Sequence, residues 1–77
     1  MKKLNDILAR VLEISNESIT DETSPASVPS WDSFNGLMLV SELEREFNVH
    51  FTMEEVVAVK NVKDIKEALQ RHGVKDE

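Results

Sequence analysis

Apolar residues recur at helical spacing in the first part of the chain. They follow the i, i+3, i+4, i+7, i+8 pattern of a helix with one buried face, at Leu4, Ile7, Leu8, Val11 and Leu12. This pattern predicts a helix over about residues 3–14, with Ser15-Asn16 after its end. A second run, rich in helix formers, predicts a helix over residues 33–47 with Asp32 as its N-cap.

Two further helices are predicted near the C-terminus. Thr52 and Glu55 have the spacing of a capping box, and the β-branched residues after them predict a short helix over residues 53–59. Asn61 is the expected N-cap of a last helix, and Gly73 is its expected C-terminal cap. The predicted buried face of this helix consists of Val62, Ile65, Ala68 and Leu69.

Helical periodicity disappears between residues 15 and 32. This segment contains both prolines of the chain, which disfavour a long regular helix. A connection of this length in a compact domain is usually functional or disordered. We expect Ile19 to dock on the core, and Val28 and Trp31 are candidates to do the same. A short helical turn fits within the segment.

Together these patterns predict an all-α protein. The expected architecture is a small four-helix bundle of three longer helices and a short third helix, with a long loop between the first two. The 77 residues suit a single domain, residues 1–77, in which residues 74–77 are expected to fray. A domain of this size buries only about 60% of the surface that its unfolded chain exposes. An enclosed active-site cavity would therefore take up much of the core.

The predicted helix over residues 33–47 has two apolar faces. At about 100° per residue, the face that spans the helix holds Gly36, Leu39, Val40, Leu43 and Phe47, and we assign it to the core. The nearly opposite face holds Phe34, Leu37, Met38 and Ser41. We expect this second face to be at least partly exposed and to act as a docking surface. The alternative is a central helix that is buried on both sides.

Composition narrows the possible partners. The formal net charge is −6, from 15 acidic and 9 basic residues, which disfavours nucleic acid and anionic membranes and favours basic or apolar docking surfaces. No apolar run approaches the roughly 20 residues that span a bilayer, and the N-terminus lacks the apolar core of a secretion signal. We expect a monomeric cytoplasmic protein that does not span a membrane.

Ser33 is the candidate for chemistry. As the first residue of a helix, it lies at the positive end of the helix dipole, a favourable place for a phosphate ester. No sequence signal links it to a base and an orienting acid, which a serine nucleophile requires, so an enzyme is the least expected class. The chain has no cysteine, hence no thiolate nucleophile or cysteine metal site, and its acids show no EF-hand pattern. On its own, Ser33 could be an unmodified helix-start serine.

The chain resembles an acyl carrier protein. The residues that carry the resemblance are Asp32-Ser33-Phe34 after a long loop, the segment Leu43-Glu44-Arg45-Glu46-Phe47 at the end of the helix that follows, and the helix start Thr52-Met53-Glu54-Glu55. The resemblance runs from the first helix through Leu69. The position of the Asp-Ser pair, rather than the pair alone, makes the match specific.

This resemblance implies a carrier that does no chemistry itself. Ser33 would accept 4′-phosphopantetheine from coenzyme A through a phosphopantetheinyl transferase. The thiol of that arm would carry acyl groups as thioesters between enzymes of a fatty-acid, polyketide or other specialised pathway. Asp32 and Phe34 match the motif beside the modified serine. The positions that the family uses to meet partner enzymes fall on Phe34, Leu37, Met38, Ser41 and Glu44, and no metal is implied.

Several residues depart from the family pattern. Phe34 stands where the family usually has Leu, and Met38 where it often has an acid, so the docking surface is bulkier and more apolar. Trp31 directly before Asp32 is more typical of specialised carriers. Gly36 lies in the first turns of the helix, where it costs about 1 kcal/mol relative to Ala, and it could let the arm, the loop or the third helix approach closely. These departures favour a specialised carrier.

Other interpretations stay open at this stage. The chain could be a peptidyl or aminoacyl carrier, or an unmodified helical interaction module that uses the same face of the 33–47 helix. Trp31 is interpreted as an anchor of the loop on the core, and His50 as a loop residue at the mouth of the bundle. Glu44 and Glu46 are either a solvated helix edge or partner contacts.

Overall fold

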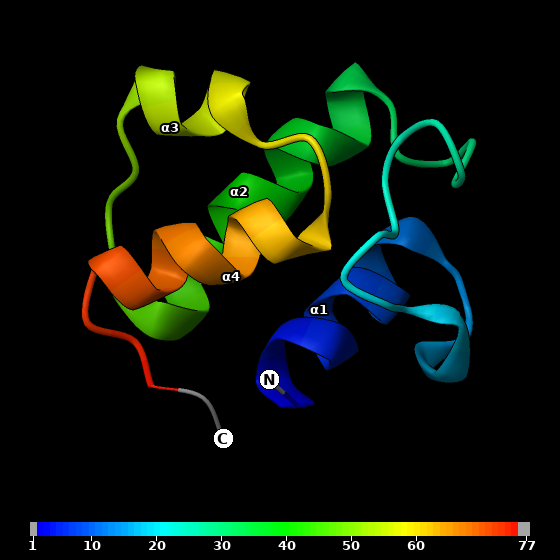
Figure 1. The fold of residues 1–77 in the computed structure, drawn as a ribbon, viewed down its shortest axis with the longest axis horizontal. Coiled ribbons are helices and arrows are strands. Elements are labelled where there is room, and N and C mark those ends of the chain that lie inside the picture. The colour runs from blue at the N-terminus through cyan, green and yellow to red at the C-terminus, as the bar shows by residue number, and fades with distance from the viewer. Residues whose placement is uncertain (1, 76–77) are drawn as a thin grey trace.

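The computed structural model describes residues 2–75. These residues form four α-helices, α1 (Lys2–Leu12), α2 (Ser33–Phe47), α3 (Met53–Ala58) and α4 (Val62–Arg71), and one short 3-10 helix, η1 (Asn16–Ser18). Figure 1 shows α3 at the same edge of the molecule as the first turns of α2, with α1 on the opposite side. The described residues contain no strand. The predicted all-α architecture, with a short third helix and a long first loop, is confirmed.

Side chains ahead of the first turn fix where three helices begin. The Asp32 carboxylate accepts a hydrogen bond from the backbone N–H of Asn35 (2.9 Å), so α2 starts directly after it, as predicted. Thr52 and Glu55 form a complete capping box at α3. Asn61 caps α4 through its side-chain oxygen. All three N-caps were predicted correctly.

The three longer helices end in the same way. A residue in the left-handed conformation follows each helix: Glu13 (φ 55°), Asn48 (φ 54°) and Gly73 (φ 84°). The next residue donates its backbone N–H to a carbonyl five positions back (3.0–3.1 Å), and these donors are Ile14, Val49 and Val74. This is the Schellman arrangement, in which the apolar residue after the cap packs against its helix. All three apolar side chains are half-buried against the core.

Two helices end earlier than predicted. α1 ends at Leu12 rather than near Ile14, because Glu13 adopts the left-handed conformation. Within the tail predicted to fray, Val74 packs against the core as the apolar residue of the α4 cap, and residues 76–77 lie outside the described residues. α3 ends at Ala58, one residue earlier than predicted, where the backbone becomes extended.

The core lies between α1, α2 and α4. Each of these helices contributes apolar residues from its predicted buried face, although Val11 of α1 and Gly36, Val40 and Phe47 of α2 are only partly buried. The buried hydrophobic residues are Leu4, Ile7, Leu8, Leu12, Trp31, Leu39, Leu43, Val62, Ile65, Ala68 and Leu69. Full burial of one such aliphatic side chain stabilises a fold by about 1.5–3 kcal/mol. By contrast, α3 contributes no buried residue.

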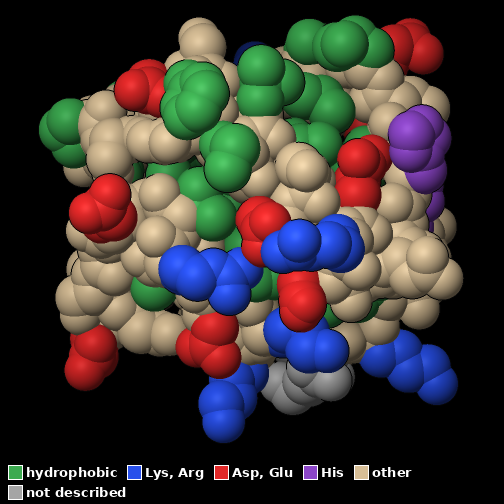
Figure 2. All heavy atoms as spheres, turned by 180° about the vertical axis from the view of Figure 1, so that it is seen from behind, with side chains coloured by type: hydrophobic (Ala, Val, Ile, Leu, Met, Phe, Trp, Pro, Cys, Tyr) green, Lys and Arg blue, Asp and Glu red, His purple; other side chains and the backbone are tan. Residues whose placement is uncertain are grey.

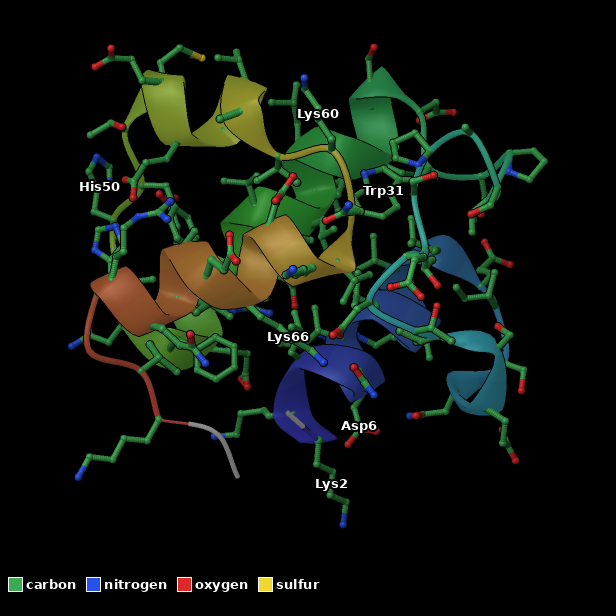
Figure 3. All side chains as sticks on the ribbon, viewed as in Figure 1. Lys2, Asp6, Trp31, His50, Lys60 and Lys66 are labelled. Carbon is green, nitrogen blue, oxygen red and sulfur yellow. The ribbon has the colours of Figure 1, made fainter. Side chains whose placement is uncertain are left out.

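The long loop between α1 and α2 is anchored at several points. Ile19 and Val28 pack against the core, and Trp31 is part of it, which confirms the expected anchors. Figure 3 shows Trp31 pointing inward between the loop and α2. The predicted short helical turn is η1.

The loop also completes the start of α4. The backbone N–H groups of Val62 and Lys63 donate to the carbonyls of Thr23 (2.9 Å) and Asp21 (3.0 Å). First-turn N–H groups have no partner within their own helix, so the loop supplies two of the missing acceptors. The ammonium of Lys66 lies 2.7 Å from the Asp21 carboxylate, and this ion pair lowers the pKa of Asp21.

Candidate functional site

Ser33 is exposed at the first position of α2. The Asp32 carboxylate accepts the N-cap hydrogen bond from the Asn35 backbone, so the backbone on either side of Ser33 is held in place while Ser33 itself is exposed. A phosphate ester at a helix N-terminus interacts favourably with the helix dipole, by about 0.3–1 kcal/mol at a surface position. The Asp32 carboxylate offsets part of this gain. The position therefore suits a hydroxyl that an external enzyme modifies.

The segment just before Ser33 is tied to both flanking helices. The Ser30 hydroxyl donates to the carbonyl of Leu12, at the end of α1 (2.6 Å). The Asn35 side-chain amide donates to the carbonyl of Ser30 (2.7 Å). Trp31, which lies between these bonds in sequence, is only 8% exposed. The predicted role of Trp31 as a loop anchor is confirmed.

An apolar cleft of about 170 Å³ opens beside Ser33. Residues of α2, α3 and α4 and the loops next to them line it, among them Ser33, Gly36, Val40, Phe51, Val56 and Ala68. Trp31 closes one side, and Glu55 supplies a carboxylate. No local sequence pattern indicates this cleft, because its walls come from segments far apart in the chain. Ser33 is the wall residue that sequence reasoning had already selected.

Gly36 lies in the wall of this cleft, next to the loop. A Cβ at this position would lie 3.7 Å from Nε1 of Trp31, which is ordinary van der Waals contact. Gly36 was expected to let the arm, the loop or the third helix approach closely, and the structure shows the loop residue Trp31 beside it. The absence of a side chain at Gly36 leaves space in the cleft, although an alanine would fit there without a steric conflict.

The second apolar face of α2 is exposed. The exposed fractions are 71% for Phe34, 63% for Leu37 and 45% for Met38, and Ser41 is exposed beside them. We call these four residues the outer face of α2. The alternative of a helix buried on both sides is therefore wrong. Figure 2 shows hydrophobic side chains gathered along the upper edge of the molecule, where the start of α2 and α3 lie.

Two exposed apolar residues on α3 extend this edge. Met53 is 73% exposed and Val57 is 70% exposed. Sequence reasoning did not single them out, although their i, i+4 spacing places them on one face of a helix. Val56 of α3 and Val59, the residue after the helix, are partly buried. α3 thus has both partly buried and exposed apolar residues.

Glu44 has a structural contact that the sequence did not indicate. Its carboxylate accepts a hydrogen bond from the backbone N–H of Phe51 (2.8 Å) and lies 3.5 Å from Nδ1 of His50. Through these contacts Glu44 holds the loop after α2 in place. Its side chain is 26% exposed, so only part of it is accessible to a partner. Glu46 is exposed. The side chain of His50 is 92% exposed in the loop, as Figure 3 shows at the outer edge of the molecule.

Glu55 joins the start of α3 to the end of α4 beside the cleft. Its carboxylate accepts the backbone N–H of Thr52 (2.9 Å) and lies 2.9 Å from Nε2 of His72. The hydrogen bond from the Thr52 backbone, followed by that of His72, lowers the pKa of Glu55. The His72 ring also packs edge-on against Phe51, with 5.2 Å between the ring centroids. Residues 2–75 hold no cluster of metal-ligating side chains.

The fold places an exposed serine at the start of α2, beside an apolar cleft. Residues 2–69 match the family model described as a phosphopantetheine attachment site. Since this match covers most of the chain, the protein belongs to that family and, within it, to the acyl carrier proteins. It is a carrier and not an enzyme, and its prosthetic group is covalent 4′-phosphopantetheine. No helix within residues 2–75 has the length and apolar character needed to cross a membrane.

Curated relatives and solved structures agree with this assignment. The chain is 31% identical over 71 residues to an acyl carrier protein from Brachyspira hyodysenteriae, with 91% of each chain covered. It is 33% identical over 70 residues to one from Syntrophobacter fumaroxidans, covering 91% of this chain and 86% of the relative. The holo acyl carrier protein of Geobacter metallireducens superposes with a TM-score of 0.77 at 25% identity, covering 99% of this chain and 93% of that chain.

A fourth comparison concerns the fold alone. A proposed acyl carrier protein from Mycobacterium tuberculosis superposes with a TM-score of 0.82 at 22% sequence identity. The superposition covers 92% of this chain and 95% of that chain. The helical arrangement is thus shared across nearly the whole length of both proteins.

Proposed function

We propose that Ser33 carries the 4′-phosphopantetheine arm and that the protein shuttles acyl thioesters between the enzymes of a specialised biosynthetic pathway. The observation that carries this proposal is the exposed Ser33 hydroxyl, at the start of α2 and in the wall of an apolar cleft. In the transfer, the Ser33 oxygen bonds to the phosphorus of the phosphopantetheine group and displaces the nucleotide part of coenzyme A. The hydroxyl proton is lost, and the new phosphodiester adds a negative charge at the helix start.

The residues around Ser33 have positioning roles in this proposal. Asp32 fixes the first residue of α2, and the bonds of Ser30 and Asn35 hold the segment before it. Phe34, the next residue, projects into solvent, where a transferase that binds Ser33 would meet it. Ser33 itself needs no catalytic base, because the transferase supplies the chemistry.

The cleft favours an acyl cargo over an aminoacyl or peptidyl one. Its walls are largely apolar, and burial of a polar group without a hydrogen-bond partner costs about 1–3 kcal/mol in proteins. An apolar cavity of about 150 Å³ binds benzene, so a cleft of about 170 Å³ holds on the order of six carbon atoms. A longer acyl chain requires a wider cleft. α3 contributes no buried residue, so moving α3 outward would widen the cleft with the smallest loss of core packing.

A specialised pathway is supported by the outer face of α2. Phe34 and Met38 expose bulky apolar surface at positions where the family usually has Leu and often has an acid. Contiguous apolar surface on a monomer usually marks a docking site. We therefore assign partner docking to Phe34, Leu37, Met38 and Ser41, with Glu44 at its edge.

Attachment at Ser33 is tested with coenzyme A and a broad-specificity phosphopantetheinyl transferase. Intact-mass measurement is expected to show the addition of one phosphopantetheinyl group to the wild type and none to Ser33→Ala. Ser41→Ala is the matched control, since Ser41 is an exposed serine on the same helix, and it should be modified like the wild type. No addition to the wild type, or equal addition to Ser33→Ala, contradicts the proposal. Partner binding that persists without the arm would favour an unmodified interaction module.

The cargo is tested by loading the holo protein with thioesters of different polarity. A hexanoyl group should shift the methyl NMR signals of the cleft residues Val40 and Val56, while an aminoacyl group of similar length should leave them near their holo values. Val74, half-buried outside the cleft, is the internal reference. Equal shifts for both cargoes would contradict the preference for an acyl group.

A further inference from the structure

We propose that the indole N–H of Trp31 is a hydrogen-bond donor for a carbonyl oxygen of the loaded arm, at the mouth of the cleft beside Ser33. This inference rests on the proposed carrier function and names the polar group that the cleft recognises. The oxygen belongs either to an amide of the arm or to the acyl cargo at or near its thioester. Both sources offer the same acceptor, and the test separates them.

Trp31 carries an unpaired donor in a buried side chain. The residue is 8% exposed and belongs to the hydrophobic core. None of the described residues accepts a hydrogen bond from its Nε1, since the side-chain bonds nearby join Ser30, Asp32 and Asn35 to backbone groups. Within residues 2–75, Nε1 is also not among the fully enclosed polar atoms without a partner. An indole N–H can only donate and usually has a partner when buried, so this one borders accessible space and lacks an acceptor.

Gly36 opens this space toward the cleft. A Cβ at position 36 would have the edge of the Trp31 indole as its nearest neighbour, at 3.7 Å from Nε1 and 3.9 Å from Cδ1. Both residues line the cleft. N–H···O bonds measure about 2.7–3.2 Å between the heavy atoms, so a ligand oxygen that enters the gap left by the glycine can come within bonding distance of Nε1.

The loop holds the indole in place before any ligand arrives. The Trp31 backbone N–H donates to the carbonyl of Val28 (2.9 Å), and the Ser30 hydroxyl ties the preceding residue to Leu12 (2.6 Å). A donor that is already ordered loses little rotamer freedom when it binds. The apolar surroundings also strengthen a hydrogen bond, because the local dielectric constant is low.

The donor lies where the arm enters the cleft. Trp31 is two residues before Ser33, and Gly36 is about one helical turn after it. Figure 3 shows Trp31 beside the first turns of α2. An arm that leaves Ser33 and turns into the cleft passes this point before its cargo reaches the apolar wall residues farther along α2, Val40 and Leu43. The oxygens that come near the indole are therefore those of the arm and of the first carbons of the cargo.

The other polar side chain of the cleft has the opposite character. Glu55 lines the cleft, but its carboxylate already accepts hydrogen bonds at the start of α3. A carboxylate can only accept, so it repels a carbonyl oxygen. Once Ser33 is esterified, Trp31 is the one cleft-lining side chain within residues 2–75 that can donate a hydrogen bond. The cleft thus combines a single donor at its mouth with apolar walls.

The test follows the indole N–H by NMR in the isotope-labelled protein. Trp31 is the only tryptophan of the chain, so its indole signal is identified directly. The apo, holo, hexanoyl and 3-oxohexanoyl forms are compared, and intact mass verifies each of them. Trp31→Phe keeps an aromatic ring without the donor. Val56→Ala is the matched control, because it truncates another wall of the cleft and leaves the donor in place. Circular dichroism verifies that both variants are folded.

The indole signal is expected to move downfield when its acceptor arrives. Its exchange with water should slow by about fivefold, the factor that corresponds to one hydrogen bond of ordinary strength. A change already present in the holo form assigns the acceptor to an amide of the arm. A change that first appears with hexanoyl or with 3-oxohexanoyl assigns it to the thioester or to the ketone of the cargo. The Tm gain on that loading step should be smaller in Trp31→Phe than in the wild type and should persist in Val56→Ala.

Two results would overturn the inference. The first is an indole signal that keeps its apo position and exchange rate in every loaded form, which means that the N–H meets only water. The second is an equal Tm gain in the wild type and Trp31→Phe. If Trp31→Phe does not fold, the wild-type signal alone decides. A confirmed mass gain keeps the carrier function intact in these cases, whereas absence of any mass gain in the wild type overturns the proposed function and this inference with it.

Discussion

The inner and outer faces of α2 are built from similar residues but have opposite environments. Leu39 and Leu43 are each 2% exposed, whereas Leu37, on the same helix, is 63% exposed. The difference lies in their neighbours, because α1 and α4 cover the inner face and no described element covers Leu37. Exposed apolar side chains add little to the stability of the isolated domain, and a patch of them is most simply explained by the binding of a partner protein. Under the proposed function, the two faces thus separate stability from recognition on one helix.

The largest expected effect comes from truncating the inner face. Leu43→Ala should lower the free energy of unfolding by about 2–5 kcal/mol, because it leaves a cavity in a packed core. Leu37→Ala, the same change on the outer face, should stay within about 0.5 kcal/mol of the wild type. Urea denaturation followed by circular dichroism measures both. Similar losses for the two variants would mean that the faces are not separate in function.

A charge on the outer face should affect recognition without affecting the fold. Met38→Glu is expected to keep the helical circular dichroism signal and to change kcat/KM with carrier-dependent enzymes by about tenfold, since it alters the docking surface. Phosphopantetheine transfer rates measured with several transferases give the readout. Unfolding of this variant would show instead that Met38 supports the core.

Gly36 tests the inner face next to the cleft. Gly36→Ala should raise the free energy of unfolding by up to about 1 kcal/mol, because alanine has the higher helix propensity and its Cβ would only touch the Trp31 ring. For a domain of this size, 1 kcal/mol corresponds to a shift of about 4–8 °C in Tm. Thermal unfolding of the apo protein measures the change. A lower Tm would indicate that the cleft wall has no room for the methyl group.

The smallest effect concerns pH and the attachment of α3, which flanks the cleft on the inner side of α2. The pKa of Glu55 is lowered in the fold by the Thr52 backbone and by His72. Its stabilising contribution is therefore present above the unfolded value of about 4.3 and is lost as the pH falls through the lower folded value. Glu55→Gln should reduce the fall of Tm between about pH 5 and pH 3. The exposed neighbour Glu54→Gln controls for the loss of one charge, and equal slopes for both variants would contradict the prediction.

The sequence predicted features that depend on neighbouring residues. Asp32, Thr52 and Asn61 cap the helices that they were expected to cap, because the acceptor and the donor are only a few residues apart. The separation of the α2 faces was also correct, since helical periodicity alone determines which residues share a side. The left-handed Glu13 was missed because this conformation is usually occupied by glycine or asparagine.

Features built from distant segments could not be predicted in this way. The Arg10–Glu42 pair joins α1 to α2, and the Glu55–His72 pair joins α3 to α4. Neither has a local pattern, because each depends on how whole helices pack. The same holds for the cleft beside Ser33. Sequence thus located the serine and the exposed face, while packing determined the charge and shape of their surroundings.

The hydrogen bond from the Ser30 hydroxyl to the Leu12 carbonyl links the segment before Ser33 to the end of the first helix. An enzyme that modifies Ser33, as proposed, would therefore bind a segment whose conformation depends on that helix. Holding one residue in a single backbone conformation costs about 1–2 kcal/mol of conformational entropy. In the folded domain the segment before the serine is already ordered before an enzyme binds. A free peptide with the sequence of residues 30–47 would lose this entropy when it binds the enzyme. We therefore expect such a peptide to be a much poorer acceptor than the intact chain, so that the recognised unit is the folded domain and not a linear motif.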